Sequence, residues 1–237
     1  MFSSNLRAGL LGLLLLSHES LAGVTAERTR VVFHEGQREA SLSLVNQNTY
    51  PVIVQTWIDD GAIDSTPEVA QAPIIPIPPI FRLNPNQQRS LRLLYTEQML
   101  PKDRESLYWL NLYEIPPQPL EPLTEGQSRL TVTLRTQMKV IYRPKGLKPD
   151  ISSVPANLVT FRKIGDELII ENPTPYIITL SSIETEQSRL PMTEGPLLPF
   201  SKFTLALPQS LPSNSSKIKF TWIDDDGNTR LGESTLR

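Results

Sequence analysis

The sequence predicts an all-β protein made of two immunoglobulin-like β-sandwich domains, and three observations support this prediction. Apolar residues alternate with polar ones over many segments, which is the period of a strand with one buried face. Proline, glycine, asparagine and serine separate these segments at short intervals, and a helical period is almost absent. The 237 residues, 39% hydrophobic and 20% charged, suffice for two domains of ordinary size.

The N-terminal segment has the features of a secretory signal peptide. A single early cation, Arg7, precedes an apolar run at 8–16 that is too short to span a bilayer, and small residues follow at Ser20 and Ala22. We expect residues 1–22 to be the signal and the mature chain to be exported. No second apolar run of transmembrane length follows, so we expect no membrane insertion.

The first predicted domain spans residues 23–143. Its expected strands are 30–35, 39–46, 51–59, 88–95, 106–115 and 130–142. Alternation through apolar positions defines 39–46, and aromatic residues enrich 106–115. We expect a loop at 60–79. Its proline-rich part, 72–79, is expected to be extended or at a sheet edge, because proline cannot donate to a β-ladder.

The last strand of this domain, 130–142, is unusually long. Its apolar residues share one face: Leu130, Val132, Leu134, Met138 and Val140. Thirteen residues would span roughly 43 Å, whereas an ordinary strand has about five or six residues. Two interpretations stay open, a half-buried strand of its own sandwich and a strand partly used by another protein. Pro144 should end the strand, and we expect a hinge at 144–147.

The second predicted domain spans residues 148–237. Its expected strands are 159–162, 167–171, 177–184, 201–207, 217–224 and 229–233. Three aspartates at 224–226 faintly resemble the start of a calcium loop, but the distal glutamate is missing, so we expect a hairpin turn there.

Charge and composition argue against several classes of function. The formal net charge is −2, whereas nucleic-acid binding normally needs a cationic excess. The chain has no cysteine, and His34 is the only histidine after residue 22. It also has no G-x-S-x-G elbow, P-loop or dinucleotide fingerprint. We therefore expect no enzyme, catalytic residue, cofactor, metal site or nucleic-acid partner.

Five segments together resemble the periplasmic chaperones of the chaperone-usher pathway, which assemble pili and fimbriae. The signature-like segment is 103–111 (DRESLYWLN), followed by Ile-Pro-Pro at 115–117. The others follow the family's order: 28–33 (RTRVVF), 78–83 (PPIFRL), 139–144 (KVIYRP) and 171–176 (ENPTPY), with a weaker likeness at 222–227 (WIDDDG). Five motifs in one order are far more specific than any single motif.

This resemblance implies two immunoglobulin-like domains in an L-shaped, boomerang arrangement that bind an unfinished pilin or fimbrial subunit. Such a subunit lacks its last strand, and the chaperone lends its own long edge strand in donor-strand complementation. The resemblance also implies a periplasmic location, delivery to an outer-membrane usher and possible self-association of the free form.

By position, the resemblance assigns two groups of binding residues. Arg30 and Lys139 correspond to a basic pair that binds the subunit's C-terminal carboxylate, and both groups suit an anion. Leu130, Val132 and Leu134 correspond to the residues that enter the subunit groove. We expect the anchor to fix register, because a one-residue slip would replace these side chains by threonines.

A third group, Glu105, Arg143 and Asp225, corresponds to a charge network between the domains near the hinge. The loop 118–128 is longer than in the short-loop branch of the family but lacks the cysteines of the long-loop branch, which favours a short-loop-like member.

The alternative function is that of a structural or adhesive surface protein, since pilins and adhesins also have signals and sandwich domains. Such a protein would be recovered in fibres, whereas a chaperone stays in the periplasm with one subunit.

Overall fold

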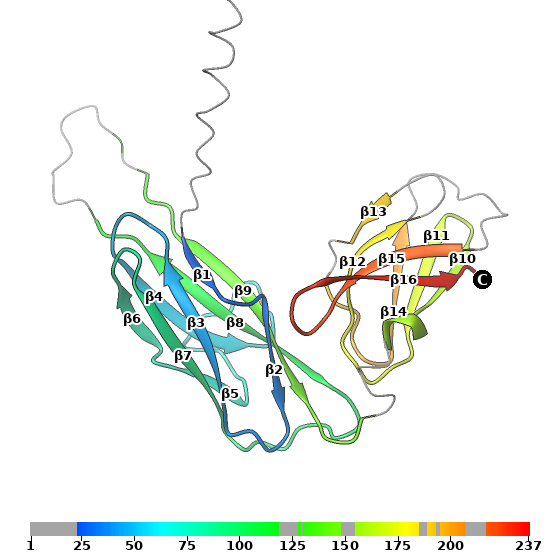
Figure 1. Ribbon diagram of the computed structural model, residues 1–237, viewed down its shortest axis with the longest axis horizontal. Helices are drawn as coiled ribbons and strands as arrows, with labels where there is room; N and C mark the ends of the chain where they lie inside the picture. The colour runs from blue at the N-terminus through cyan, green and yellow to red at the C-terminus, as the bar shows by residue number, and fades with distance from the viewer. Residues whose placement is uncertain are drawn as a thin grey trace, which may run out of the picture.

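The computed structural model describes residues 23–118, 128, 130–147, 155–184, 189–192, 195–206 and 217–237. The predicted signal peptide and most of the loop 118–128 lie outside these residues. The described chain forms two β-sandwiches set at an angle to each other (Figure 1), which confirms the all-β, two-domain prediction. No helix in this part of the chain is both long enough and apolar enough to cross a bilayer.

The first domain packs a four-stranded sheet on a five-stranded sheet. The four-stranded sheet has the order β1 (Val24–Ala26), β3 (Glu39–Asn46), β7 (Gln88–Tyr95), β5 (Ile74–Ile77). The five-stranded sheet has the order β2 (Arg30–His34), β9 (Leu134–Arg143), β8 (Ser106–Ile115), β4 (Val52–Asp59), β6 (Ile80–Leu83). Only β2 and β9 run parallel, and the other described pairs in this domain are antiparallel.

Alternating side chains build the core between these two sheets. Leu42 and Leu44 of β3 point into the same core as Leu110 and Leu112 of β8, and all four are almost completely buried. Burying each such side chain stabilises the fold by about 1.5 to 3 kcal/mol.

The second domain packs a three-stranded sheet on a four-stranded sheet. The first has the order β10 (Thr160–Ile164), β11 (Glu167–Asn172), β14 (Ser201–Ala206); the second has the order β13 (Arg189–Pro191), β12 (Thr179–Glu184), β15 (Lys217–Ile223), β16 (Thr229–Thr235). A 3-10 turn, η2 (Pro155–Leu158), precedes β10. Phe161 and Phe220 lie in the core with ring centroids 5.4 Å apart.

The turn between β15 and β16 is the hairpin turn that the sequence predicts. The Asp224 carboxylate accepts the backbone N–H groups of Asp226, at 3.1 Å, and Asn228, at 2.8 Å. The turn reaches towards the first domain (Figure 1).

The structure corrects the prediction of a strand at 130–142. Strand β9 begins at Leu134, because its ladder with β8 ends at the pair Glu114 and Leu134. Strand β8 ends at Ile115, where Pro116 and Pro117 follow, and proline has no N–H to donate to a ladder. Residues 130–133 therefore lie outside the ladder, although Thr133 Oγ1 accepts the Tyr113 hydroxyl at 3.1 Å.

Short strands account for most of the remaining differences. The sequence interpretation omitted β1, β6 and β13, which have three, four and three residues and no clear alternation. It expected 72–79 to be extended or at an edge, and β5 does form an edge strand beside β7.

Candidate functional site

Strand β9 has two halves with different surroundings. Residues 139–143 pair with β2, and 139–142 pair with β8 as well. Residues 134–138 pair with β8 alone, and no other described strand covers their second edge. We call 134–138 the open half and 139–143 the closed half. The open half presents backbone groups that another strand can pair with.

The apolar face of β9 leaves the core along this open half. Met138 and Val140 are buried in the core of the first domain. Further along the same sequence alternation, Leu134 is 47% exposed, Val132 61% and Leu130 87%, and of these three only Leu134 lies within β9. The three sequence-predicted groove residues, which we call the apolar stripe, are thus exposed in or just before the half of β9 whose second edge is unpaired, a combination that can add a strand to another protein.

The predicted basic pair lies where the two halves meet. Arg30 of β2 and Lys139 of β9 are register partners, so their Cα atoms are separated by about 4.8 Å, the spacing of neighbouring strands. Arg30 is almost fully buried and donates from Nη1 to the carbonyl oxygen of Ile223 at 3.2 Å. Its Nε is buried without a hydrogen-bond partner among the described residues.

Burial and mutual repulsion perturb both cations. Burial lowers the pKa of Arg30, although the charges of Asp225 and Asp224 oppose this shift. Burial also lowers the pKa of Lys139, and the charge of Arg30 lowers it further. An anion bound between two desolvated cations relieves both effects, so this pair is suited to a carboxylate.

The third predicted group is also brought together. Arg143 forms an ion pair with Glu105 through Nε and binds Asp225 in bidentate fashion, with Nη1 at 2.6 Å and Nη2 at 3.0 Å from its oxygens. The other oxygen of Glu105 accepts the backbone N–H of Ile177 at 2.7 Å. Because Asp225 and Ile177 belong to the second domain, these contacts join the two domains.

The charges of this network are stabilised by one another, because burial removes most of their contact with water. Burial raises the pKa of Glu105, and the charge of Arg143 opposes that shift. Burial alone would lower the pKa of Arg143, but its hydrogen bonds to Asp225 and the charge of Glu105 outweigh burial, so its pKa is raised. Removing one member would leave a buried charge without its partner.

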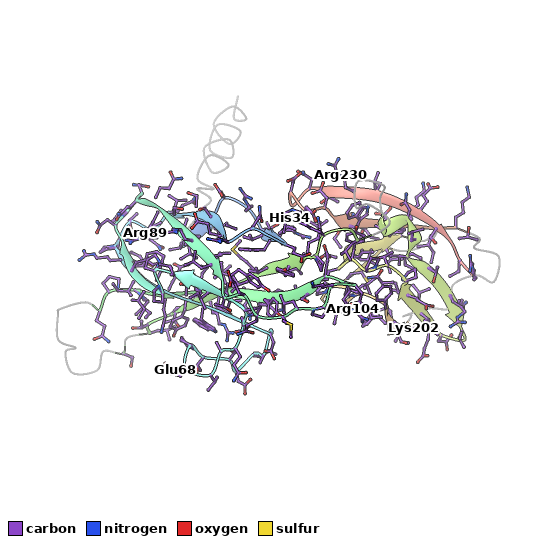
Figure 2. The ribbon with its side chains drawn as sticks, turned by 90° about the horizontal axis from the view of Figure 1, so that it is seen from below. His34, Glu68, Arg89, Arg104, Lys202 and Arg230 are labelled. Atoms are coloured by element: carbon purple, nitrogen blue, oxygen red, sulfur yellow. The ribbon has the colours of Figure 1, made fainter. Side chains whose placement is uncertain are left out.

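Three further contacts reinforce the junction between the domains. The backbone N–H of Glu105 donates to the carbonyl oxygen of Pro175 at 2.9 Å. The guanidinium carbon of Arg104, labelled in Figure 2, lies 5.1 Å from the centroid of the Phe200 ring. In the β15–β16 turn, Gly227 packs so closely on Thr29 that a Cβ there would lie 2.8 Å from the threonine Oγ1.

Sequence reasoning missed one residue of this site. Trp109 of β8 pairs in register with Lys139, and the lysine Nζ lies 5.0 Å from its ring centroid. This cation–π contact holds the ammonium group beside Arg30. Trp109 stands inside the signature-like segment, but its partner is evident only from the register of β8 and β9. The described residues contain no cluster of side chains that could hold a metal ion.

Comparison with known proteins gives a consistent result for both domains. Residues 23–148 match the family described as "Pili and flagellar-assembly chaperone, PapD N-terminal domain". Residues 153–234 match "Pili assembly chaperone PapD, C-terminal domain".

Similar proteins cover nearly the whole chain. "Probable fimbrial chaperone YadV" of Escherichia coli K12 is 34% identical over 228 residues, which cover 93% of this chain and 92% of that protein. "Chaperone protein FimB/FhaD" of Bordetella pertussis is 32% identical over 218 residues, covering 90% of this chain and 87% of that protein. A solved structure of Salmonella enterica SafA pilin in complex with the SafB chaperone matches with a TM-score of 0.75 and 31% identity, covering 91% of this chain and 97% of that one.

Proposed function

The chain belongs to the family of PapD-like pilus-assembly chaperones, and we propose on this premise that it binds, folds and caps pilin or fimbrial subunits by donor-strand complementation. We propose that it does so in the periplasm and delivers the subunits to an outer-membrane usher. The family is one of chaperones rather than enzymes, and the proposed function needs no catalytic group, cofactor or metal.

One observation supports this function above the others, the open half of β9 with its exposed apolar stripe. A subunit that lacks a strand needs backbone partners and side chains for its empty pockets. The open half and the segment 130–133 before it offer both, since the second edge of the open half is unpaired and Leu130, Val132 and Leu134 are exposed. Strand addition of this kind gains affinity from main-chain bonds and specificity from alternate side chains.

The basic pair supplies a fixed end point for the added strand. We propose that the subunit's C-terminal carboxylate binds Arg30 and Lys139, two cations whose desolvation and mutual repulsion an anion would relieve. Five residues separate Leu134 from Lys139, which is about 17 Å along an extended strand. A carboxylate held at one end therefore determines which subunit pocket meets each apolar side chain.

We propose that the charge network also matters for the anchor, because the anchor involves residues of both domains. Arg30 belongs to the first domain but donates to Ile223 of the second. Movement of one domain against the other would therefore displace the anchor. We propose that Glu105, Arg143 and Asp225 hold the interdomain angle at which the anchor is complete.

A structural or adhesive role for these immunoglobulin-like domains is the competing proposal. A fibre subunit polymerises, whereas a chaperone leaves with its client. Membership of the chaperone family favours the second outcome.

Coexpression tests this choice directly. The protein is produced together with candidate subunits from the same operon, and periplasmic extracts and sheared surface fibres are analysed separately. We expect a soluble one-to-one complex with a subunit in the periplasmic extract. Recovery of the protein within fibres, with no complex in the extract, would exclude the chaperone function.

A further inference from the structure

The face of β9 opposite the apolar stripe carries a buried polar cluster that the proposed function does not use. Asp59 of β4 and Asn111 of β8 are almost completely buried there. Arg135 of the open half reaches the same cluster. Cross-strand register brings these residues together, because Asn111 pairs with Trp57 on one side and Gln137 on the other.

Asn111 links the other two members of the cluster. Its side-chain N–H group donates to Asp59 Oδ2 at 2.8 Å, and its Oδ1 accepts Arg135 Nε at 2.8 Å. Gln137 donates to the same Oδ1 at 3.0 Å. Asp59 also accepts from the Trp57 indole at 3.0 Å. Both buried groups thus have several partners, as buried polar groups require.

Arg135 is held on several sides at once. Its Nη1 donates to the carbonyl oxygen of Ile63 at 2.7 Å, in the connection between β4 and β5. Its Nη2 lies 3.5 Å from Asp59 Oδ2, and its guanidinium carbon lies 5.0 Å from the centroid of Trp57. One side chain therefore ties the open half of β9 to β4, to β8 and to the loop that follows β4.

Arg135 lies close to the end of the β8–β9 ladder, where β9 has only one partner strand. It follows Leu134, the first residue of β9, where the ladder with β8 ends. Pairing with β2 begins only at Lys139, so 134–138 has one backbone partner strand. Arg135 thus ties the strand down beside the segment that carries Leu130 and Val132, and within that segment the Tyr113 hydroxyl donates to Thr133 Oγ1 at 3.1 Å.

We propose that Asp59, Asn111 and Arg135 form an outer-face clamp that positions the donor segment 130–134 before a subunit arrives. The clamp holds the open half against β8, so that the apolar stripe projects at a fixed distance from the anchor at Arg30 and Lys139. Arg135 is a positioning residue in this arrangement. The inference rests on the proposed function and adds a determinant of subunit register to it.

Loss of the clamp acts through conformational entropy. Without the guanidinium contacts, this end of the β8–β9 ladder keeps its backbone bonds and the neutral side-chain bonds of Gln137 and Thr133, and it opens more often. A subunit must then order one or two more residues when it binds. Ordering each residue weakens binding by roughly 5-fold to 30-fold.

Arg135→Met tests the clamp, since methionine keeps an apolar stem on Trp57 and removes the guanidinium. Arg92→Met is the matched control, because Arg92 also lies on a strand and forms an ion pair, with Glu39, in the other sheet. Segment-resolved amide exchange is measured on both free proteins, and subunit affinity by titration. We expect faster exchange at 134–138 but not at 139–143, about tenfold or greater loss of affinity, and no effect of the control substitution.

Arg135→Lys should restore part of the affinity, because lysine keeps the charge but lacks the planar fork. Unchanged exchange and unchanged affinity in Arg135→Met would overturn the clamp. Wild-type exchange provides an independent test that needs no variant. Equally fast exchange at 134–138 and 130–133 would show that the open half is not held. If the wild-type protein binds no subunit, the proposed function fails instead, whatever the exchange pattern.

Discussion

The two halves of β9 share one strand and one alternation of side chains, yet they differ in nearly everything that surrounds them. The closed half has a strand on each edge, and its Val140 and Tyr142 lie in the core. The open half has one strand on one edge, and its apolar residue Leu134 is about half exposed.

This difference shows how one strand can serve both folding and binding. In the closed half, apolar side chains contribute to the free energy of unfolding of the first domain. In the open half, the same kind of side chain contributes little to that free energy and is available to a partner. The basic pair stands at the boundary, at Lys139, so the closed half gives the anchor a rigid base.

The strongest test of the comparison replaces Leu130, Val132 and Leu134 together by threonine, which keeps strand propensity. Because each leucine or valine contributes about 1.5 to 3 kcal/mol when buried, we expect subunit affinity to fall by about 4 kcal/mol or more, roughly a thousandfold. The melting temperature of the free protein should stay near that of the parent. Calorimetric titration and thermal melting measure the two quantities.

The matching substitution in the closed half is Val140→Thr. It keeps the volume but buries a hydroxyl group, so the free energy of unfolding should fall by about 1 to 3 kcal/mol. If the triple variant at Leu130, Val132 and Leu134 loses as much stability as Val140→Thr, the exposed residues and the closed half do not differ in the way described.

The next largest effect concerns the boundary between the halves. Arg30→Ala and Lys139→Ala should each weaken subunit binding by about 2 to 5 kcal/mol, roughly 30-fold to several thousandfold. Lys139→Ala should not lower the melting temperature, because it removes one of two desolvated cations that repel each other, whereas Arg30→Ala should lower it modestly because it also loses the hydrogen bond to Ile223. Normal recovery of subunit with both variants would show that Arg30 and Lys139 do not bind the carboxylate.

Arg143 ends the closed half, and its loss should loosen the domains. In Arg143→Ala, Glu105 and Asp225 lose their shared partner, but parting of the domains lets water reach both carboxylates. We therefore expect a cost of about 1 to 3 kcal/mol in interdomain docking, with each sandwich intact. Small-angle scattering should show a broader distribution of shapes. Scattering and melting curves that match the parent would argue against the network.

The smallest expected effect is a pH dependence of subunit binding. In the free protein the pKa of Lys139 is lowered from its ordinary value of 10.5. A bound carboxylate favours the charged ammonium and raises this pKa again in the complex. Binding should be at full strength below the free-protein pKa of Lys139 and weaken as the pH rises through its pKa in the complex. Titrations at alkaline pH measure this, and Lys139→Arg should remove the dependence. An equal dependence in Lys139→Arg would assign it to another group.

Local sequence patterns predicted the elements that depend on local signals. Strand β8 runs from Ser106 to Ile115 as expected, because its aromatic residues end at a pair of prolines. The start of β9 could not be predicted in the same way. The alternation continues smoothly through Leu130, but a strand also needs a partner, and only the register with β8 shows that the partner has ended.

The same limit applies to the polar residues. Asp59 and Asn111 are polar residues in two different strands, and alternation alone would place each of them on a solvated face. Their burial follows from cross-strand pairing that places Arg135 and two indoles beside them. Resemblance to a family identified Arg30 and Lys139 as a pair, but the unpartnered donor of Arg30 appears only in three dimensions.

The close contact between Thr29 and Gly227 has a consequence for how ionic strength acts on the hinge. Closing the domains further is opposed by overlap of atoms, which salt does not change. Opening is opposed in part by the pair between Arg143 and Asp225, whose carboxylate side chain is 35% exposed and therefore partly screened by salt. Added salt should thus widen the range of interdomain angles only towards open shapes, so that the hinge responds to ionic strength in one direction alone.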